Sequence, residues 1–176
     1  MNVPASHTSA LEGWFLSAYE QYADAIFRHC ALRLGDREQG KELMQETFIR
    51  AWESAGRGIE IENCRAFLYK VANNLIIDVA RRRKLRTQDS LEALQETGFD
   101  IPDREPGPER KTEGALAIES MKKLEEPYRT VLVMRFIDGL SLSDIASILK
   151  ISQNVISVRI HRALQKLESA LNPSHE

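Results

Sequence analysis

Apolar residues recur three or four positions apart along most of the chain, which is the spacing of a helix with one buried face. In the N-terminal half this pattern covers residues 19–34, 43–52 and about 65–86. Gly35 follows the first stretch, and two glycines at 56–58 follow the second. No stretch alternates apolar and polar residues between hairpin turns, as a strand would. The N-terminal half is therefore predicted to form three helices.

The composition changes sharply after the third helical stretch. Residues 88–109 contain seven acidic residues against one basic residue, and three prolines crowd the second half of this segment. Such a segment favours an extended acidic linker. Helical periodicity then returns. We therefore predict an all-α fold with two small helical domains, residues 10–87 and 112–172, joined by a flexible linker at 88–111.

The second domain contains strong signals for where helices begin and end. Pro127 separates one helix from the next, which is expected to run from Tyr128 to Ile137 before a turn at Asp138 and Gly139.

After this turn, Ser141 and Asp144 have the spacing of a capping box, in which each side chain binds the other residue's backbone amide. The short helix that they open is predicted to bury Ile145, Ala146 and Leu149.

The last helix differs on its two faces. Lys150 and Ile151 form a tight turn before it, and Ser152 can cap it. Its inner face is predicted to bury five apolar residues: Ile156, Ile160, Ala163, Leu164 and Leu167. Its outer face is mainly polar and basic and carries Asn154, Ser157, Val158, His161, Arg162 and Gln165, with Arg159 at the edge. This arrangement is typical of a helix-turn-helix, whose second helix enters the DNA major groove. A plain helical hairpin with a solvated face is the alternative.

The third stretch ends in a run of positive charge. The run consists of Arg81, Arg82, Arg83, Lys84 and Arg86. It could attract phosphates without reading sequence, although basic residues at a helix end also favour the helix macrodipole. Upstream, Asn73 and Asn74 are poor helix formers within an apolar helix. Their amides could bind base edges, or bend or cap the helix, and the residues alone predict that the helix continues through them.

The second helix carries large groups around more of its circumference than one core requires. These are Gln45, Glu46, Phe48, Ile49 and Trp52. Phe48 and Trp52 are neighbours on the helix surface, since they lie four residues apart. An aromatic pair beside Glu46 indicates a surface for a protein partner. In the alternative interpretation both rings belong to the core.

Composition and charge exclude several classes of protein. The 176 residues are 43% hydrophobic, which is enough for true cores, and the net charge is −2. Any DNA contact must therefore come from local basic patches. The first ten residues lack the pattern of a signal peptide, and no apolar run approaches a membrane span. We expect a cytoplasmic protein without membrane insertion.

Chemistry-bearing residues are sparse. Cys30 and Cys64 lie far apart, which favours two reduced thiols over a disulfide or a metal site. The four histidines are scattered without metal-ligand spacing. No phosphate-binding loop or nucleophile elbow is present. We therefore expect no catalytic residue, metal, cofactor or small-molecule substrate, and no enzymatic activity.

Together these segments resemble the extracytoplasmic-function (ECF) sigma factors of the sigma-70 family. The resemblance covers residues 14–172. Residues 41–52 resemble the polymerase-binding helix, region 2.2. Residues 65–83 resemble regions 2.3 and 2.4, which melt and read the minus-ten element. Residues 138–146 and 155–167 resemble region 4.2, which reads the minus-thirty-five element. The order of all three across an acidic linker makes the resemblance specific.

The resemblance implies a transcription initiation factor with core RNA polymerase, promoter DNA and an anti-sigma factor as partners. It assigns polymerase binding to Gln45, Glu46, Phe48 and Trp52. Contacts with the minus-ten element fall to Asn73, Asn74, Asp78, Arg81, Arg82, Arg83 and Lys84. Contacts with the minus-thirty-five element fall to Ser152, Asn154, Ser157, Val158, Arg159, His161 and Arg162. It also implies a base-capturing loop near Asn73 and Asn74.

The chain departs from the family pattern in the last helix. Val155, Ser157 and Val158 stand where many relatives have a Thr, a basic residue and a Ser. This difference predicts an altered promoter sequence in which Val158 packs on a thymine methyl group. Two alternatives remain open. A stand-alone helix-turn-helix regulator would leave the N-terminal half unexplained, and a decoy that sequesters an anti-sigma factor would not need the basic run.

Overall fold

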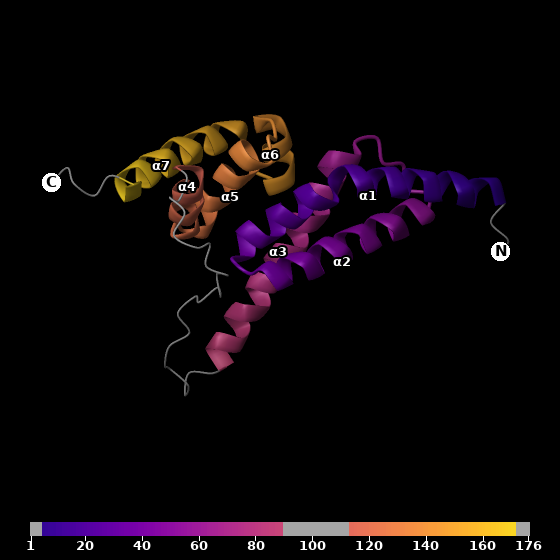
Figure 1. The fold of residues 1–176 in the computed structure, drawn as a ribbon, viewed down its shortest axis with the longest axis horizontal. Helices are drawn as coiled ribbons and strands as arrows, with labels where there is room; N and C mark the ends of the chain where they lie inside the picture. The colour runs from indigo at the N-terminus through magenta and orange to yellow at the C-terminus, as the bar shows by residue number, and fades with distance from the viewer. Residues whose placement is uncertain (1–4, 90–112, 172–176) are drawn as a thin grey trace. The chain divides into compact units, whose positions relative to one another are not determined.

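The computed structural model describes residues 5–89 and 113–171. Every regular element in these two ranges is helical, as the sequence predicted (Figure 1). The chain divides between Asp89 and Ser90 into two compact units, which we call unit 1 and unit 2. In the part of the chain that the structure describes, no helix is long and apolar enough to cross a membrane. Most of the predicted linker lies outside the described residues, so its boundaries stay a prediction.

Unit 1 consists of three long helices: α1 (Ala5–Leu34), α2 (Arg37–Gly56) and α3 (Cys64–Asp89). Each helix begins before the periodic apolar stretch from which it was predicted. Gly35 turns the chain after α1 with a φ of 70°, a conformation that glycine adopts without steric cost. Asp36 then caps α2, because its carboxylate accepts a hydrogen bond from the Gln39 amide at 3.0 Å.

The core of unit 1 lies where α1 packs against both α2 and α3. It buries apolar side chains from all three helices, among them Ile26, Cys30, Phe48, Leu68, Ala72 and Ile76. Gly40 allows α1 and α2 to approach closely. A Cβ atom there would lie only 2.7 Å from the Ala31 backbone.

Polar side chains also tie the helices of unit 1 together. Arg33 of α1 donates a hydrogen bond to Asn73 Oδ1 of α3 at 3.3 Å, and both residues are buried. Nearer the end of α3, Arg83 donates to Gln39 Oε1 of α2 at 2.7 Å. These contacts join residues about forty positions apart and tie α3 to both other helices of the unit.

Unit 2 is built from shorter helices: α4 (Glu113–Lys122), α5 (Glu126–Leu132), α6 (Leu142–Leu149) and α7 (Gln153–Leu171). The single helix expected from Tyr128 to Ile137 is instead α5 followed by a π-helical turn, η1 (Val133–Ile137). The Asp138 amide accordingly binds the Val133 carbonyl, five residues back, at 2.9 Å. Gly139 turns the chain after it with a φ of 64°.

The core of unit 2 is aliphatic. Its fully buried members include Val131, Leu132, Val133, Met134, Leu140, Ile145, Ile148 and Ile156. The predicted burial was wrong for several residues of this core. Ile148 is buried, whereas Ala146 and Leu149 are only half-buried, because α6 packs with a slightly different face inward. On α7, Ile160 and Leu167 are half-buried, and Leu164 is exposed where it lines a hollow together with Phe136 of η1.

Candidate nucleic-acid and protein-binding surfaces

The turn between α6 and α7 is defined by local contacts. The predicted capping box is present: Ser141 Oγ accepts from the Asp144 amide at 3.0 Å, and the Ser141 amide donates to Asp144 Oδ2 at 3.2 Å. Lys150 ends α6 in the left-handed conformation, with a φ of 55°. Ser152 Oγ then accepts from the Val155 amide at 3.3 Å, which supports the first turn of α7. A short helix, a tight turn and a longer helix therefore form the predicted helix-turn-helix.

The outer face of α7 lies where the sequence predicted it. All seven side chains assigned to the minus-thirty-five element lie outside the core, and Arg159 alone among them is half-buried. Asn154, Val158 and Arg162 lie roughly opposite the buried Ile156, given about 100° per residue. Val155 is also exposed and neighbours Val158. The sequence prediction did not include Val155 in the site, although its place three residues before Val158 could have indicated it.

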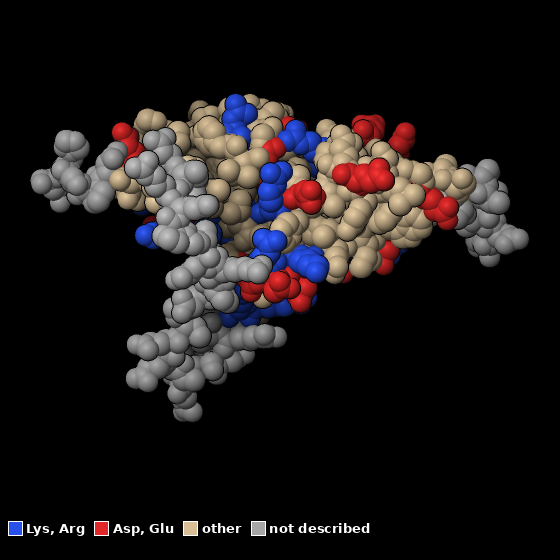
Figure 2. Space-filling model, in the orientation of Figure 1, with Lys and Arg blue, Asp and Glu red and all other residues tan. Residues whose placement is uncertain are grey.

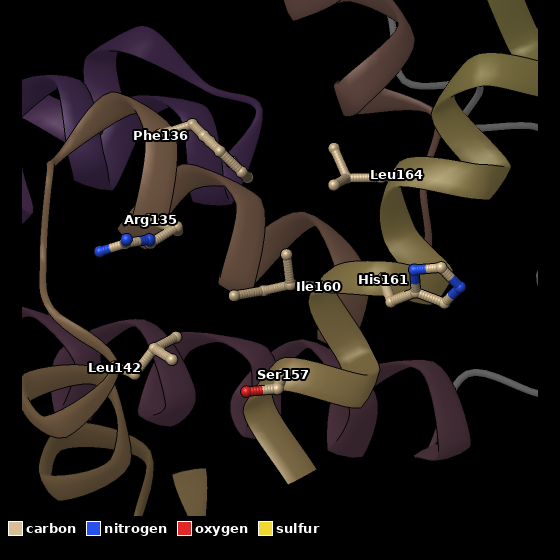
Figure 3. A pocket seen from close by; sticks show the side chains of 7 residues that line it. All are labelled: Arg135, Phe136, Leu142, Ser157, Ile160, His161 and Leu164. Atoms are coloured by element: carbon tan, nitrogen blue, oxygen red, sulfur yellow. The ribbon is translucent and has the colours of Figure 1, made fainter. Parts of the chain in front are cut away.

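One flank of α7 faces a groove that the sequence prediction missed. A hollow of about 300 Å³ lies between α7, η1 and the start of α6. Its lining is largely apolar and consists of Arg135, Phe136, Leu142, Ser157, Ile160, His161 and Leu164. Figure 3 shows Ile160 directed between the η1 side chains and Leu142, while the His161 ring points away from the rest. Phe136 and Leu164 leave much of their apolar surface exposed there.

On α2, the residues predicted to bind a partner separate into two groups. Phe48 is only 2% exposed and packs edge-on against Phe15 and Tyr19 of α1. It is therefore a core residue. The prediction that both aromatic rings face a protein partner was wrong for Phe48. Trp52 is half-buried, with its ring centroid 5.1 Å from that of Phe15.

The rest of this α2 surface is accessible. Gln45 and Ile49 are exposed, and Glu46 accepts a hydrogen bond from Arg50 at 2.7 Å. Gln45, Glu46, Ile49 and Trp52 together form what we call the α2 surface. It combines an exposed aliphatic side chain, an amide and an acid beside a half-buried indole.

On α3, neighbouring residues have opposite environments. Asn73 is 1% exposed and bound to Arg33, so its amide belongs to the interior and not to a DNA-facing surface. Asn74 is exposed. The helix continues through both residues, as the residue pattern predicted, so the loop implied here by the resemblance was wrong. The backbone of α3 is therefore regular helix at Asn73 and Asn74.

The basic run lies on the end of α3 that extends beyond α1 and α2 (Figure 1). Arg81 and Arg82 are exposed, and Arg81 lies 3.8 Å from Asp78. Arg83 is half-buried and held by Gln39. The Lys84 side chain lies outside the described residues. Figure 2 shows basic side chains, with acidic ones among them, near the point where α3 extends beyond α1 and α2.

The two thiols show no sign of shared chemistry. Cys30 is buried and Cys64 half-buried, and neither forms a disulfide within the described residues. Burial raises the pKa of the Cys64 thiol, which disfavours the reactive thiolate. Among the described residues, no group of three or more His, Cys, Asp or Glu side chains could hold a metal ion.

Comparison with known proteins agrees with this division into two units. Residues 18–86 match the family description "Sigma-70 region 2", and residues 116–167 match "Sigma-70, region 4". The ECF RNA polymerase sigma factor SigW of Bacillus subtilis is 29% identical over 165 residues, which is 89% of this chain and 88% of SigW. SigL of Mycobacterium tuberculosis is 27% identical over 168 residues, which is 94% of each chain.

Solved structures show the same fold. The sigma factor RpoE from Bartonella quintana, solved with the anti-sigma factor NepR, has a TM-score of 0.74 and 20% identity and covers 92% of this chain and 98% of its own. CnrH, solved with the cytosolic domain of CnrY, has a TM-score of 0.62 and 20% identity and covers 97% and 96%.

Unit 1, which carries the basic α3, thus matches sigma-70 region 2. Unit 2, which carries the helix-turn-helix, matches sigma-70 region 4. The chain belongs to the sigma-70 family of transcription initiation factors. Within that family it is an ECF sigma factor.

Proposed function

We propose that this ECF sigma factor binds core RNA polymerase through the α2 surface and reads promoters with α3 and α7. The observation that carries this proposal is the outer face of α7, which presents amide, basic and apolar groups on the second helix of a helix-turn-helix. Such a face can read base edges and hold phosphates at once. Binding alone is required of this chain, so we assign it no catalytic reaction.

The α2 surface is the proposed site for core polymerase. Ile49 and Trp52 supply apolar area, and Gln45 and Glu46 supply polar groups at its edge. Phe48 supports this surface from below by packing against Phe15 and Tyr19. This combination suits a protein interface, in which buried apolar anchors are surrounded by a polar rim.

The exposed residues of α3 are the proposed minus-ten surface. Asn74 can capture an extruded base, and Arg81 and Arg82 can hold phosphates. Asp78 and Lys84 remain candidates beside them. The buried Asn73 and the half-buried Arg83 act by holding α3 against another helix. In this proposal residues 10–87 form the polymerase and minus-ten domain.

Unit 2 has two proposed partners. The outer face of α7, with Ser152, Asn154, Val158, Arg159 and Arg162, meets the minus-thirty-five element. Ser157 and His161 lie toward the groove flank, where they can contact either DNA or protein.

The groove between η1 and α7 is proposed to take part in binding an anti-sigma factor, which would hold the protein inactive. Its apolar lining and exposed Phe136 suit an amphipathic helix. The structure of RpoE, which was solved with the anti-sigma factor NepR, supports this proposal. Because core polymerase and promoters are its targets, we place the protein in the cytoplasm.

Run-off transcription with core polymerase on a randomised promoter library tests the proposal. We expect the wild-type holoenzyme to select duplexes that share two sequence elements. The Arg162→Ala holoenzyme should no longer prefer the wild-type minus-thirty-five element. Tight, sequence-specific DNA binding by the chain without polymerase would instead show a stand-alone regulator. No transcription at all, together with tight binding of an anti-sigma factor, would show a decoy.

A second experiment tests Asn74. Catching a flipped base offsets an unstacking cost of a few kcal/mol. Asn74→Ala should therefore slow open-complex formation on duplex DNA more than on a template with a pre-melted bubble. Equal defects on both templates would contradict base capture.

A further inference from the structure

Two valines stand on the part of α7 that would enter DNA first. Val155 is 42% exposed and Val158 is 46% exposed. They are the third and sixth residues of a helix that begins at Gln153, and a spacing of three places them side by side. Valine has a lower helix propensity than alanine, and an exposed valine gains no burial that would offset this cost. Their position therefore calls for an explanation outside the fold of unit 2.

The surroundings of this valine pair are polar and basic. Asn154 and Arg162 are exposed beside the pair, and the left-handed turn residue Lys150 is exposed just before the helix. Such positive charge favours a polyanion over an apolar protein surface. The Ser157 hydroxyl, between the two valines in sequence, donates to the Gln153 carbonyl at 3.0 Å. Ser157 also lines the groove flank of α7, so its hydroxyl does not interrupt the apolar surface that the two valines share.

We propose that Val155 and Val158 read thymine methyl groups in the major groove of the minus-thirty-five element. This inference rests on the proposed function of α7 and names what that face recognises. In the second helix of a helix-turn-helix, the N-terminal residues contact base edges, and both valines lie in the first two turns. The thymine C5-methyl group is the one apolar feature that base pairs present there. Valine cannot hydrogen-bond a base edge, so a thymine is the base with which it makes a favourable contact.

Replacing thymine by uracil tests the inference, because it removes only the methyl group. The wild-type holoenzyme first selects its preferred minus-thirty-five element from a library of duplexes randomised over that element. Each thymine of the winning duplex is then replaced singly by uracil, and the apparent Kd is measured. Burial of one methyl group predicts about a three- to five-fold loss of affinity at one or two positions. A thymine-to-uracil replacement in the spacer serves as the DNA control.

Protein variants assign each methyl contact to a side chain. Val158→Ser and Val155→Ser, which replace the valine methyl groups by a hydroxyl, should each abolish the uracil effect at its own thymine and leave the other unchanged. Leu171→Ala is the matched control, because Leu171 is 41% exposed at the far end of the same helix. It should leave every uracil effect in place. Far-ultraviolet circular dichroism confirms that the variants remain helical.

Three outcomes separate the inference from the function on which it rests. Uracil effects that disappear in the valine variants support methyl reading. A clear minus-thirty-five preference without any uracil effect, or with uracil effects that persist in both valine variants, overturns methyl reading and leaves the proposed function intact. Absence of any selected minus-thirty-five element overturns the proposed function of α7 itself.

Discussion

The helices of the two units of this sigma factor are held in place in different ways. Unit 1 joins three long helices through contacts between residues far apart in sequence, such as Arg33 with Asn73 and Gln39 with Arg83. Unit 2 packs shorter helices around an aliphatic core, and local signals such as the capping box at Ser141 fix where a helix begins. Both units expose a surface suited to nucleic acid, but the surface of unit 1 is an extending basic helix end and that of unit 2 is a mixed face.

The two units also differ in how accessible their predicted contact residues are. In unit 2 every predicted site residue lies outside the core. In unit 1, Phe48 and Asn73 are buried and Arg83 is held by another helix. Packing against α1 and α2 thus buries Phe48 and Asn73 and holds Arg83, whereas the predicted face of α7 is accessible. Four predictions test this contrast, from the largest expected effect to the smallest.

Truncation of Phe48 should destabilise unit 1 alone. Phe48→Ala removes a buried ring that packs against Phe15 and Tyr19, which typically costs about 3–5 kcal/mol. Both tryptophans, Trp14 and Trp52, lie in unit 1, so fluorescence during urea unfolding reports on this unit. The unfolding midpoint should fall strongly. As the matched variant, Ile156→Ala in the unit 2 core should leave the fluorescence transition in place. A shift with both variants would show that the units unfold together.

The two neighbouring asparagines should separate stability from function. Asn73→Ala leaves the buried Arg33 without this acceptor, which should cost about 1–3 kcal/mol in the free energy of unfolding. Asn74→Ala changes an exposed side chain and should alter stability by no more than about 0.5 kcal/mol. Urea unfolding of both variants measures the difference. Equal destabilisation would contradict the difference in burial between Asn73 and Asn74.

The capping box should contribute to unit 2 through local contacts alone. Ser141→Ala removes the acceptor of the Asp144 amide and should cost about 1 kcal/mol. Hydrogen exchange followed by mass spectrometry resolves the amides of α6 from those of unit 1. Protection should fall in α6 and α7, with α1–α3 unchanged. Ser143→Ala, on the same helix but outside the box, is the control and should leave protection in α6 nearly constant.

The turn residue Lys150 should show the smallest effect, with opposite signs for stability and binding. Its φ of 55° costs a non-glycine residue about 1 kcal/mol. Lys150→Gly should therefore raise the stability of unit 2 by up to about that amount, while losing a positive charge beside α7. Thermal unfolding and the salt dependence of promoter binding measure the two effects. A Lys150→Gly variant that is less stable would show that the side chain, and not the strain, decides this turn.

Much of the architecture followed from the sequence alone, because it depends on residues three or four positions apart. The apolar periodicity indicated the helices, the Ser141–Asp144 spacing indicated the start of α6, and the polar outer face of α7 indicated its exposed side. A helix carries its own geometry, so spacing along the chain is enough to place these groups on one face. The family resemblance came from the same local segments.

Tertiary structure alone decided which members of each candidate set are buried. Phe48 lies beneath the aromatic side chains of α1 whereas Trp52 stays half-buried, and Asn73 turns inward whereas Asn74 does not. The groove beside Phe136 is formed where η1, α6 and α7 meet. These outcomes depend on neighbouring helices separated by many residues in sequence. Periodicity cannot report such neighbours, because burial is set by what packs against a face and not by the face itself.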